Sequence, residues 1–241
     1  MSIIDEVTGQ GASRWPYPVN YGKENEFSTD VLVIGGGIAG CHAAINATKR
    51  GSKVIILEKA ATVHSGCSGA GVDHWGAAYT NPACTRDLEK AAESSARRRG
   101  YVNGMLSYIT MRESFDALLD CEKMGMKFRD EDDEFAGSPM RDEESKILFA
   151  YNYRSRVNIR VNNGAKVKPF LYLELLRLGV EVIDRVMVTG LLTEDGRAGS
   201  RVVGAMGVNV RNGEFFIVNA KSTILSAAQY SGIWVFNTEL A

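Results

Sequence analysis

The 241-residue chain is poor in the residues that build metal sites and in net charge. Its four cysteines are scattered, with no CxxC pair and no histidine at ligand spacing. This pattern does not suit a zinc site or an iron–sulfur cluster, so we expect no metal and four reduced thiols. The formal net charge of -1 gives no electrostatic reason to expect binding of nucleic acid or of an acidic membrane surface.

The sequence also lacks a long hydrophobic run. No segment approaches the roughly twenty apolar residues that a membrane helix requires, so we expect no transmembrane segment. Residues 1–29 contain early acidic residues and no apolar core, which excludes a secretory signal and favours a cytoplasmic protein. We interpret these residues as a polar extension that forms no helix or strand.

The most informative segment is residues 30–59, DVLVIGGGIAGCHAAINATKRGSKVIILEK. The apolar run at residues 31–34 predicts a strand buried in a parallel sheet. Gly35, Gly37 and Gly40 follow it in a GxGxxG turn. The first glycine permits the tight turn, the second lets the backbone approach a pyrophosphate, and the third lets the next helix lie close to the strand. The N-terminus of that helix would attract the phosphates.

A second predicted strand, residues 53–57, ends at the acidic residue Glu58. Glu58 lies roughly twenty residues after the glycines, the spacing at which a carboxylate binds the ribose hydroxyls of an adenosine. An acid at this place disfavours a 2′-phosphate, so NADP is not expected. The segment therefore predicts a dinucleotide site, and the alternative is a related unit that no longer binds.

The middle of the chain reads as a loop followed by helices. The loop TVHSGCSGAGVDHWGAAYTNPAC, residues 62–84, is rich in small residues that let the backbone approach a flat ligand. Residues 86–127 show helical periodicity. The acidic runs at residues 130–134 and 142–144 predict solvent-exposed loops.

The last third predicts a short helix at residues 169–179 and then strands. Residues 181–192, 201–210 and 214–218 have strand character, and Asn212-Gly213 is a strong hairpin signal. These strands would form an antiparallel meander. Residues 222–226 would then return to the first sheet as a separate buried strand.

Together, these motifs resemble the N-terminal part of the flavoprotein family of fumarate reductase and succinate dehydrogenase, a group that includes adenylylsulfate reductase and L-aspartate oxidase. The resemblance covers residues 27–240. It implies FAD as the dinucleotide and an α/β fold, a Rossmann-like FAD-binding domain with a parallel sheet, an antiparallel meander and a helical insertion, truncated before its end. The expected divisions are residues 1–29, the N-terminal extension; 30–85, the first part of the FAD-binding domain; 86–165, the helical insertion; and 166–241, its second part.

The resemblance also implies the residues that contact FAD. Those around the pyrophosphate and ribose are Gly35, Gly37, Ile38, Ala39, Gly40, Glu58 and Lys59. The flavin-facing loop contains Ser65, Gly66, Cys67 and Gly71; the backbone of Val188 would meet the adenine, and Ala227 lies in the segment that approaches the cofactor. Respiratory members carry a covalently bonded histidine where the register here places Gly66, so the resemblance implies non-covalent FAD, as in the adenylylsulfate reductase branch.

Two departures from the family pattern affect the functional interpretation. The segment Ser226-Ala227-Ala228-Gln229 replaces a motif like ATGG, and the chain ends at Ala241, before the family's capping domain. The catalytic residues therefore stay unassigned. The leading hypothesis is the FAD-binding region of an oxidoreductase whose full-length form acts on a small-molecule substrate. A candidate partner is an iron–sulfur electron-transfer subunit.

Two alternative functions remain open. One is a non-catalytic or split fragment that needs a second chain to complete its active site. The other is an NAD-dependent enzyme that uses the same glycine turn. Asp73 and His74 are candidates to face a substrate, although their partners cannot be seen in the sequence. Cys67 is more simply a small loop residue, because nothing near it in the sequence would lower its pKa.

Overall fold

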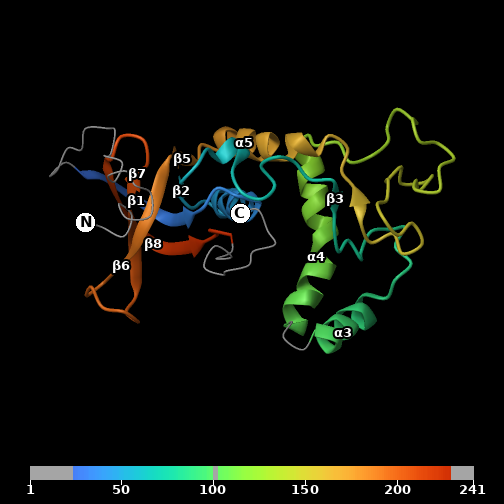
Figure 1. Ribbon diagram of the computed structural model, residues 1–241, viewed down its shortest axis with the longest axis horizontal. Coiled ribbons are helices and arrows are strands. Elements are labelled where there is room, and N and C mark those ends of the chain that lie inside the picture. Colours follow the sequence, from blue (N-terminus) through green and yellow to red (C-terminus); the bar gives the residue numbers. More distant parts are fainter. Residues whose placement is uncertain (1–23, 100–102, 229–241) are drawn as a thin grey trace, which may run out of the picture. The chain divides into compact units, whose positions relative to one another are not determined.

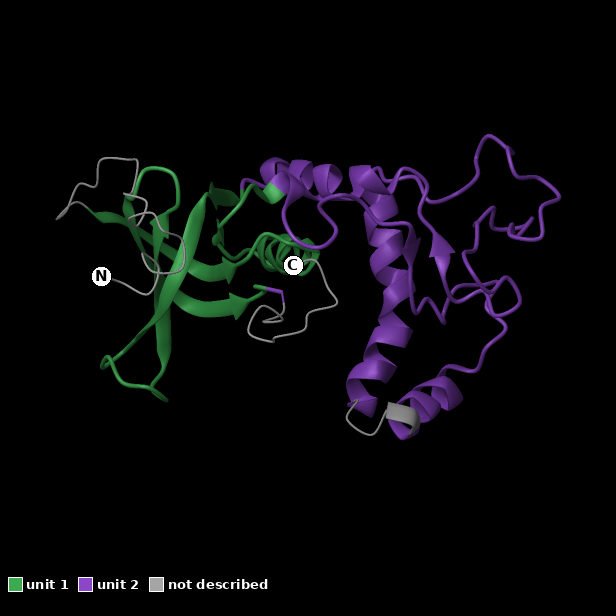
Figure 2. Cartoon of the chain, in the orientation of Figure 1, with its two compact units in different colours: residues 1–62, 180–227 green, residues 63–179, 228–241 purple. Residues whose placement is uncertain are grey.

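The computed structural model describes residues 24–99 and 103–228 (Figure 1). The chain divides into two compact units (Figure 2). Unit 1 comprises residues 1–62 and 180–227, and unit 2 comprises residues 63–179 and 228–241. The glycine turn therefore belongs to unit 1, and the small-residue loop that follows it belongs almost entirely to unit 2.

Unit 1 contains a six-stranded mixed sheet with the strand order β5-β2-β1-β8-β7-β6. Its strands are β1 (Glu24–Ile34), β2 (Val54–Glu58), β5 (Glu181–Asp184), β6 (Val186–Thr193), β7 (Val202–Asn209) and β8 (Phe215–Leu225). Strands β5, β2, β1 and β8 run parallel to one another, whereas β8, β7 and β6 form an antiparallel meander. The predicted combination of a parallel sheet with a meander is therefore confirmed.

The hydrophobic pattern explains why β2 lies inside this sheet. All five residues of β2 are buried, as expected for a parallel strand covered on both faces. Helix α2 (Ile38–Lys49) packs against β1, β2 and β8 through Cys41, Ala44 and Ile45, which are fully buried. Full burial of one aliphatic side chain contributes about 1.5–3 kcal/mol. The core of unit 1 also joins the meander to the parallel strands, with members Leu32, Ile34, Ile55, Leu57, Val186, Ala205, Phe216, Val218 and Ala220.

Some strand boundaries differ from the predicted ones. Residues 24–29 were expected in the polar extension, but they belong to β1 and pair with β8, where Phe27 stacks on Phe216 with ring centroids 6.1 Å apart. Residues 1–23 of the extension lie outside the described residues. The separate strands predicted at 214–218 and 222–226 are one continuous strand, β8. An alternation of apolar and polar residues indicates which residues can form a strand. It does not show with which strand they pair, and this pairing sets where a long strand begins and ends.

The predicted strand at residues 181–192 is interrupted at Arg185. This residue has φ 67°, in the left-handed region, and it separates β5 from β6. The two halves have different partners, because β5 pairs in parallel with β2 and β6 pairs antiparallel with β7. Arg185 also donates its N–H to the carbonyl of Ala60 (3.0 Å), which fixes the break beside the end of β2.

Unit 2 is mainly helices and loops. Its elements are most of η1 (Thr62–His64), β3 (His74–Trp75), α3 (Leu88–Arg99), α4 (Gly104–Lys123), β4 (Ile159–Arg160), η2 (Gly164–Lys166) and α5 (Val167–Arg177). The helical segment predicted at residues 86–127 is thus two helices. Asn103 begins α4, because its side chain accepts the N–H groups of Met105 (3.0 Å) and Leu106 (3.2 Å). In the described ranges, no helix combines the length and the apolar character needed to cross a membrane.

A single tryptophan anchors the short strand β3 to α4. The indole Nε1–H of Trp75 donates to the carbonyl of Ser114 (2.9 Å) and lies 3.0 Å from its hydroxyl. The Trp75 ring also meets Phe128 edge-to-face, with centroids 5.8 Å apart. Within unit 2, the indole N–H therefore has a hydrogen-bond acceptor, and the apolar part of the ring packs against another aromatic side chain.

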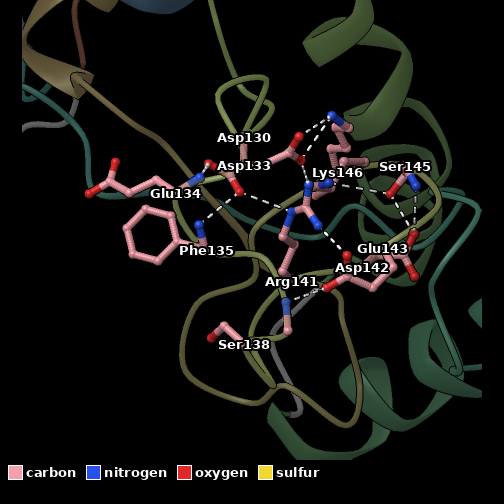
Figure 3. A network of polar contacts seen from close by, with 12 residues as sticks. Asp130, Asp133, Glu134, Phe135, Ser138, Arg141, Asp142, Glu143, Ser145 and Lys146 are labelled. Atoms are coloured by element: carbon pink, nitrogen blue, oxygen red, sulfur yellow. Dashed lines mark hydrogen bonds and ion pairs between the residues drawn. The ribbon is translucent and has the colours of Figure 1, made fainter.

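A buried guanidinium organises the loops of unit 2 (Figure 3). The Arg141 side chain is 2% exposed and forms ion pairs with Asp130, Asp133 and Glu143. Its Nε lies 2.9 Å from Oδ2 of Asp130, which is itself buried. This contact is a close ion pair rather than an aligned hydrogen bond. The expectation that the acidic runs are solvent-exposed is therefore wrong for Asp130, because Arg141, a cation outside that run, pairs with it in the interior of unit 2.

Candidate functional site

The carboxyl ends of the parallel strands meet at one edge of the sheet of unit 1. Ile34 at the end of β1 is in register with Leu57 in β2 and with Leu225 at the end of β8. Glu58 at the end of β2 is in register with Asp184 at the end of β5. In open parallel sheets, ligands bind in the crevice outside these strand ends. The glycine turn begins at this edge, directly after Ile34.

The structure shows why glycine is needed at two places in this turn. Gly35 has φ 99°, and a Cβ on it would lie 2.5 Å from the carbonyl oxygen of Ser226. A Cβ on Gly40 would lie 1.9 Å from the carbonyl oxygen of Gly35. No side chain fits either space. The first glycine therefore permits the turn beside β8, and the third lets α2 lie close to the turn and to Val33 of the preceding strand, as predicted.

The N-terminus of α2 follows the turn without a side-chain cap. Gly37 is the N-cap residue in an extended conformation, and its carbonyl accepts the N–H of Cys41 (2.9 Å). Ile38 and Ala39 stand in the first helical turn, which contains no acidic residue. The N–H groups of a first turn have no partner within the helix and lie at the positive end of its dipole. This arrangement suits an anion such as a pyrophosphate.

Glu58 ties the glycine turn to the loop after β2. Its side chain is buried, with Oε2 accepting the N–H of Gly36 (2.6 Å) and Oε1 accepting the N–H of Ala60 (2.7 Å). An ionised carboxylate has about four acceptor positions, so two further donors can bind without breaking these bonds. Two ribose hydroxyl groups match that remaining capacity. Lys59, the next residue, is exposed.

Thr62 and Asp184 support the same turn, and neither is among the predicted site residues. Oδ1 of Asp184 accepts both the N–H (2.9 Å) and the hydroxyl (2.7 Å) of Thr62. The Thr62 side chain fills the space beside Gly36, where an added Cβ would lie 2.6 Å from its Oγ1. One signal was present in the sequence, because Asp184, like Glu58, is an acid at the carboxyl end of a strand.

The remaining predicted residues of unit 1 lie on β6 and after β8. Val188 is partly buried on β6, against the core, next to an irregularity in the pairing with β7. Ala227 follows β8, and its Cα lies 3.2 Å from the place of an added Cβ on Gly35. The structure thus brings Ala227 to the glycine turn. Ala228 has φ 59°, a conformation that favours glycine.

The predicted flavin-facing loop lies in unit 2. Ser65 is buried, whereas Gly66 and Cys67 are exposed, and Cys67 is a free thiol. Two successive turns shape the loop, in which the N–H of Gly69 donates to Gly66 (2.9 Å) and that of Gly71 donates to Ser68 (3.0 Å). The predicted residues therefore form two groups, one within each unit.

Comparisons with known proteins agree with this geometry. The family model described as FAD binding domain matches residues 30–240. The chain belongs to this family. The fumarate reductase (CoM/CoB) of Methanothermobacter marburgensis has a subunit that is 34% identical over 204 residues, which cover 83% of this chain and 35% of that protein. The chain thus spans about a third of the length of this curated relative.

Solved structures show the same fold at lower identity. Adenylylsulfate reductase of Archaeoglobus fulgidus superposes with a TM-score of 0.69 at 24% identity, covering 84% of this chain and 30% of that one. The Sdh1 complex of Mycobacterium smegmatis gives a TM-score of 0.69 at 20% identity, covering 86% and 35%. The resemblance to fumarate reductase and succinate dehydrogenase flavoproteins is therefore confirmed. The chain is an FAD-binding domain of this type, and FAD is the cofactor.

The geometry of the site fits FAD. The spaces at Gly35 and Gly40 exclude any Cβ, the first turn of α2 offers N–H groups, and Glu58 has acceptor positions left. These features correspond to the pyrophosphate and ribose that FAD and NAD share. The family assignment, rather than the geometry of unit 1, favours the flavin.

Proposed function

We propose that the chain forms the FAD-binding region of an oxidoreductase like fumarate reductase and succinate dehydrogenase, and that it holds FAD without a covalent bond. The observation that carries this proposal is the glycine turn at the carboxyl edge of the sheet, tied to buried Glu58 by the N–H of Gly36. Family membership adds the identity of the cofactor.

In this proposal, the predicted residues contact different parts of FAD. The N–H groups of Gly37, Ile38 and Ala39 would hold the pyrophosphate, and Glu58 would accept the ribose hydroxyls. The backbone of Val188 would meet the adenine. The loop of residues 65–71 would lie along the flavin, with Gly66 at the place where a covalent link would need a histidine. Bound FAD supplies hydride transfer, and the protein supplies binding and orientation.

The wider context of the enzyme also belongs to the proposal. We propose that the full-length protein acts on a small-molecule substrate and works with an iron–sulfur electron-transfer subunit. An assembly is supported by the names of two relatives, because the methanogen protein is one part of a reductase and the mycobacterial structure is a complex. The division into residues 30–85, 86–165 and 166–241 is likewise proposed. The cytoplasmic location stays a prediction.

A second candidate function is a non-catalytic or split fragment whose site needs another chain. The left-handed conformation of Ala228 supports this alternative, because it places backbone strain one residue after Ala227, whose Cα lies close to Gly35. Tight FAD binding by the chain on its own would favour the first proposal.

Equilibrium titrations with FAD, FMN and NAD test the proposal. FMN lacks the adenosine and the pyrophosphate, so FAD should bind much more tightly than FMN if unit 1 holds those groups. NAD shares the adenosine and pyrophosphate with FAD but has no flavin. It therefore tests whether the flavin contributes to affinity, and it should also bind more weakly than FAD. FAD binding no tighter than that of FMN or NAD would overturn the proposal.

Glu58→Gln sharpens this test, because an amide offers a single acceptor oxygen for the two N–H groups that Glu58 now holds. We expect its Kd for FAD to rise about tenfold, equivalent to about 1.4 kcal/mol. Its weak FMN binding should not change. Glu181→Gln, at an exposed position of β5, is the matched control and should bind FAD like the unmodified chain.

A further inference from the structure

The loop after β2 is held by two consecutive residues of unit 1, Asp184 at the end of β5 and Arg185 directly after it. Oδ1 of Asp184 accepts the N–H (2.9 Å) and the hydroxyl (2.7 Å) of Thr62. The N–H of Arg185 donates to the carbonyl of Ala60 (3.0 Å). Two residues of this loop are therefore fixed from the same short segment of the chain.

Arg185 is itself held through both of its backbone polar groups. Besides the bond from its N–H to Ala60, its carbonyl accepts the N–H of Val210 (2.8 Å), the residue that follows β7. Its φ of 67° lies in the left-handed region. A residue other than glycine keeps such a conformation only where the surrounding structure imposes it. The break between β5 and β6 is therefore a fixed feature of unit 1.

The loop that is held in this way determines the hydrogen bonds of Glu58. The N–H of Ala60 donates to Oε1 of Glu58 (2.7 Å), and the N–H of Gly36 donates to Oε2 (2.6 Å). Thr62 is fully buried, and its side chain lies against Gly36, where an added Cβ would be 2.6 Å from Oγ1 and 2.9 Å from Cγ2. The two loop residues that are held therefore locate both N–H donors to Glu58.

The negative charge of Asp184 would by itself act against the binding of FAD. Asp184 is in register with Glu58 on the neighbouring parallel strand, and such strands lie about 4.8 Å apart. FAD contains an anionic pyrophosphate, so a second carboxylate at this edge of the sheet repels it. Removal of an acid that acted only through its charge would strengthen binding. If Asp184 supports binding, it must do so through its hydrogen bonds.

We infer that Asp184 is a positioning residue of the FAD site. Together with Arg185 it fixes the loop of residues 60–62, and this loop holds the carboxylate of Glu58 where the adenosine ribose binds. The inference rests on the proposed function, because the ribose of FAD is the group that Glu58 would bind. Asp184 needs no contact of its own with the cofactor. The break at Arg185 also has a functional reason, since it lets the end of β5 hold the loop while β6 continues into the meander.

Asp184→Ala and Asp184→Asn separate the hydrogen bonds of this residue from its charge. Both variants remove the charge, but asparagine keeps one acceptor oxygen, and a single oxygen of Asp184 holds both donors of Thr62. We expect Asp184→Ala to raise the Kd for FAD, and for ADP as a probe without flavin, about tenfold. Asp184→Asn should recover most of this loss. Glu181→Ala, at an exposed position of the same strand, is the matched control. An unchanged or lower Kd for Asp184→Ala, or equal weakening in both Asp184 variants, would overturn the inference.

The double variant with Glu58→Gln tests whether Asp184 acts through Glu58. Residues that act through a shared contact give changes that do not add, whereas independent residues give additive changes. In the Glu58→Gln background, Asp184→Ala should therefore raise the Kd for FAD by no more than about twofold. The full tenfold effect in that background would contradict the route through Glu58.

Hydrogen exchange of the chain without FAD keeps this inference separate from the proposed function. Asp184→Ala should speed the exchange of the Gly36 and Ala60 N–H groups about tenfold, and Asp184→Asn should speed it less. Ile56, fully buried in β2, reports any general loss of stability. If Gly36 and Ala60 gain no more than Ile56 does, the inference is overturned even when FAD binds. If their exchange responds as expected but the unmodified chain binds neither FAD nor ADP, the proposed function is overturned instead.

Discussion

Both units have an apolar core, but unit 2 adds a buried ion network to it. In unit 1, apolar side chains from parallel strands and from the meander share one core, around Leu32, Ile55 and Val218. In unit 2, apolar side chains such as Phe128, Leu148 and Phe149 are buried as well, and long loops also converge on the buried guanidinium of Arg141. Apolar contacts are non-directional and tolerate exchange among similar side chains. An ion network is directional, and loss of one member leaves a buried charge without its partner. Unit 2 should therefore be the more sensitive to single substitutions.

Arg141→Met should produce the largest effect, because it leaves Asp130 buried without its cation. We expect a loss of about 3–5 kcal/mol in the free energy of unfolding of unit 2. Trp75 reports on this unit by fluorescence during denaturation, with Trp15 and Trp234, which lie outside the described residues, replaced by Phe. Arg154→Met, at an exposed position, is the control. A small loss, similar to the control, would show that the network does not hold the loops together.

Gly40→Ala should damage unit 1 by a steric mechanism, since the added Cβ would lie 1.9 Å from the carbonyl oxygen of Gly35. We expect a cost of about 1–3 kcal/mol from overpacking and a loss of FAD binding as the turn moves. Hydrogen exchange of β1 and β2, together with FAD titration, measures both effects. Gly51→Ala has open space around its Cβ but a φ of 88°, so it should lose some stability from backbone strain and still keep FAD binding. If Gly40→Ala bound FAD normally, the close packing of α2 on the turn would not be required.

Ala228→Gly should stabilise the segment that follows β8. Ala228 has φ 59°, which costs an alanine about 1–2 kcal/mol, whereas glycine adopts it freely. Glycine also loses more chain entropy on folding, so the expected net gain in stability is about 0.5–1 kcal/mol. Ala227→Gly, at a residue without positive φ, should lose stability instead. Denaturant midpoints compare the two variants, and a loss for Ala228→Gly would contradict the assigned strain.

The smallest effect should be a pH dependence within unit 2. Hydrogen bonds from Tyr151 and His74 lower the native pKa of Asp73 to about 2, below its ordinary value of about 3.9. A lowered native pKa gives stability that is present above the unfolded value and is lost as the pH falls toward the native one. We therefore expect Asp73 to contribute a small acid-dependent loss between about pH 4 and pH 2. Acid titration of Trp75 fluorescence should show a weaker dependence for Asp73→Asn, and equal curves would contradict the assignment.

The dinucleotide unit could be predicted from sequence because its determinants are local. Gly35, Gly40 and Glu58 occupy fixed positions relative to a strand and a helix, and the structure places all three at the carboxyl edge of the sheet. The antiparallel meander was also predictable, because its strands alternate apolar and polar residues and Asn212-Gly213 is a hairpin turn signal. Such patterns act over a few residues, so one sequence can reveal them.

The strand break, the burial of Asp130 and the Tyr151 contact could not be predicted, because they depend on partners outside the local sequence pattern. The break at Arg185 lies inside a run with uninterrupted strand character, and only the two different partners of β5 and β6 reveal it. Asp130 looked exposed because its cation, Arg141, is not part of the same acidic run. The contact of Tyr151 with Asp73 likewise joins two distant loops. No periodicity encodes such pairs.

The central claim, that this chain holds FAD without a covalent bond, is tested most directly by the visible absorption spectrum of the purified chain. The protein is supplied with FAD, desalted, and then precipitated with acid. We predict flavin bands that survive desalting and pass completely into the acid supernatant. Flavin that stays with the precipitate would contradict the non-covalent assignment. A folded chain without flavin bands would contradict FAD binding by this chain and favour the fragment that needs a second chain.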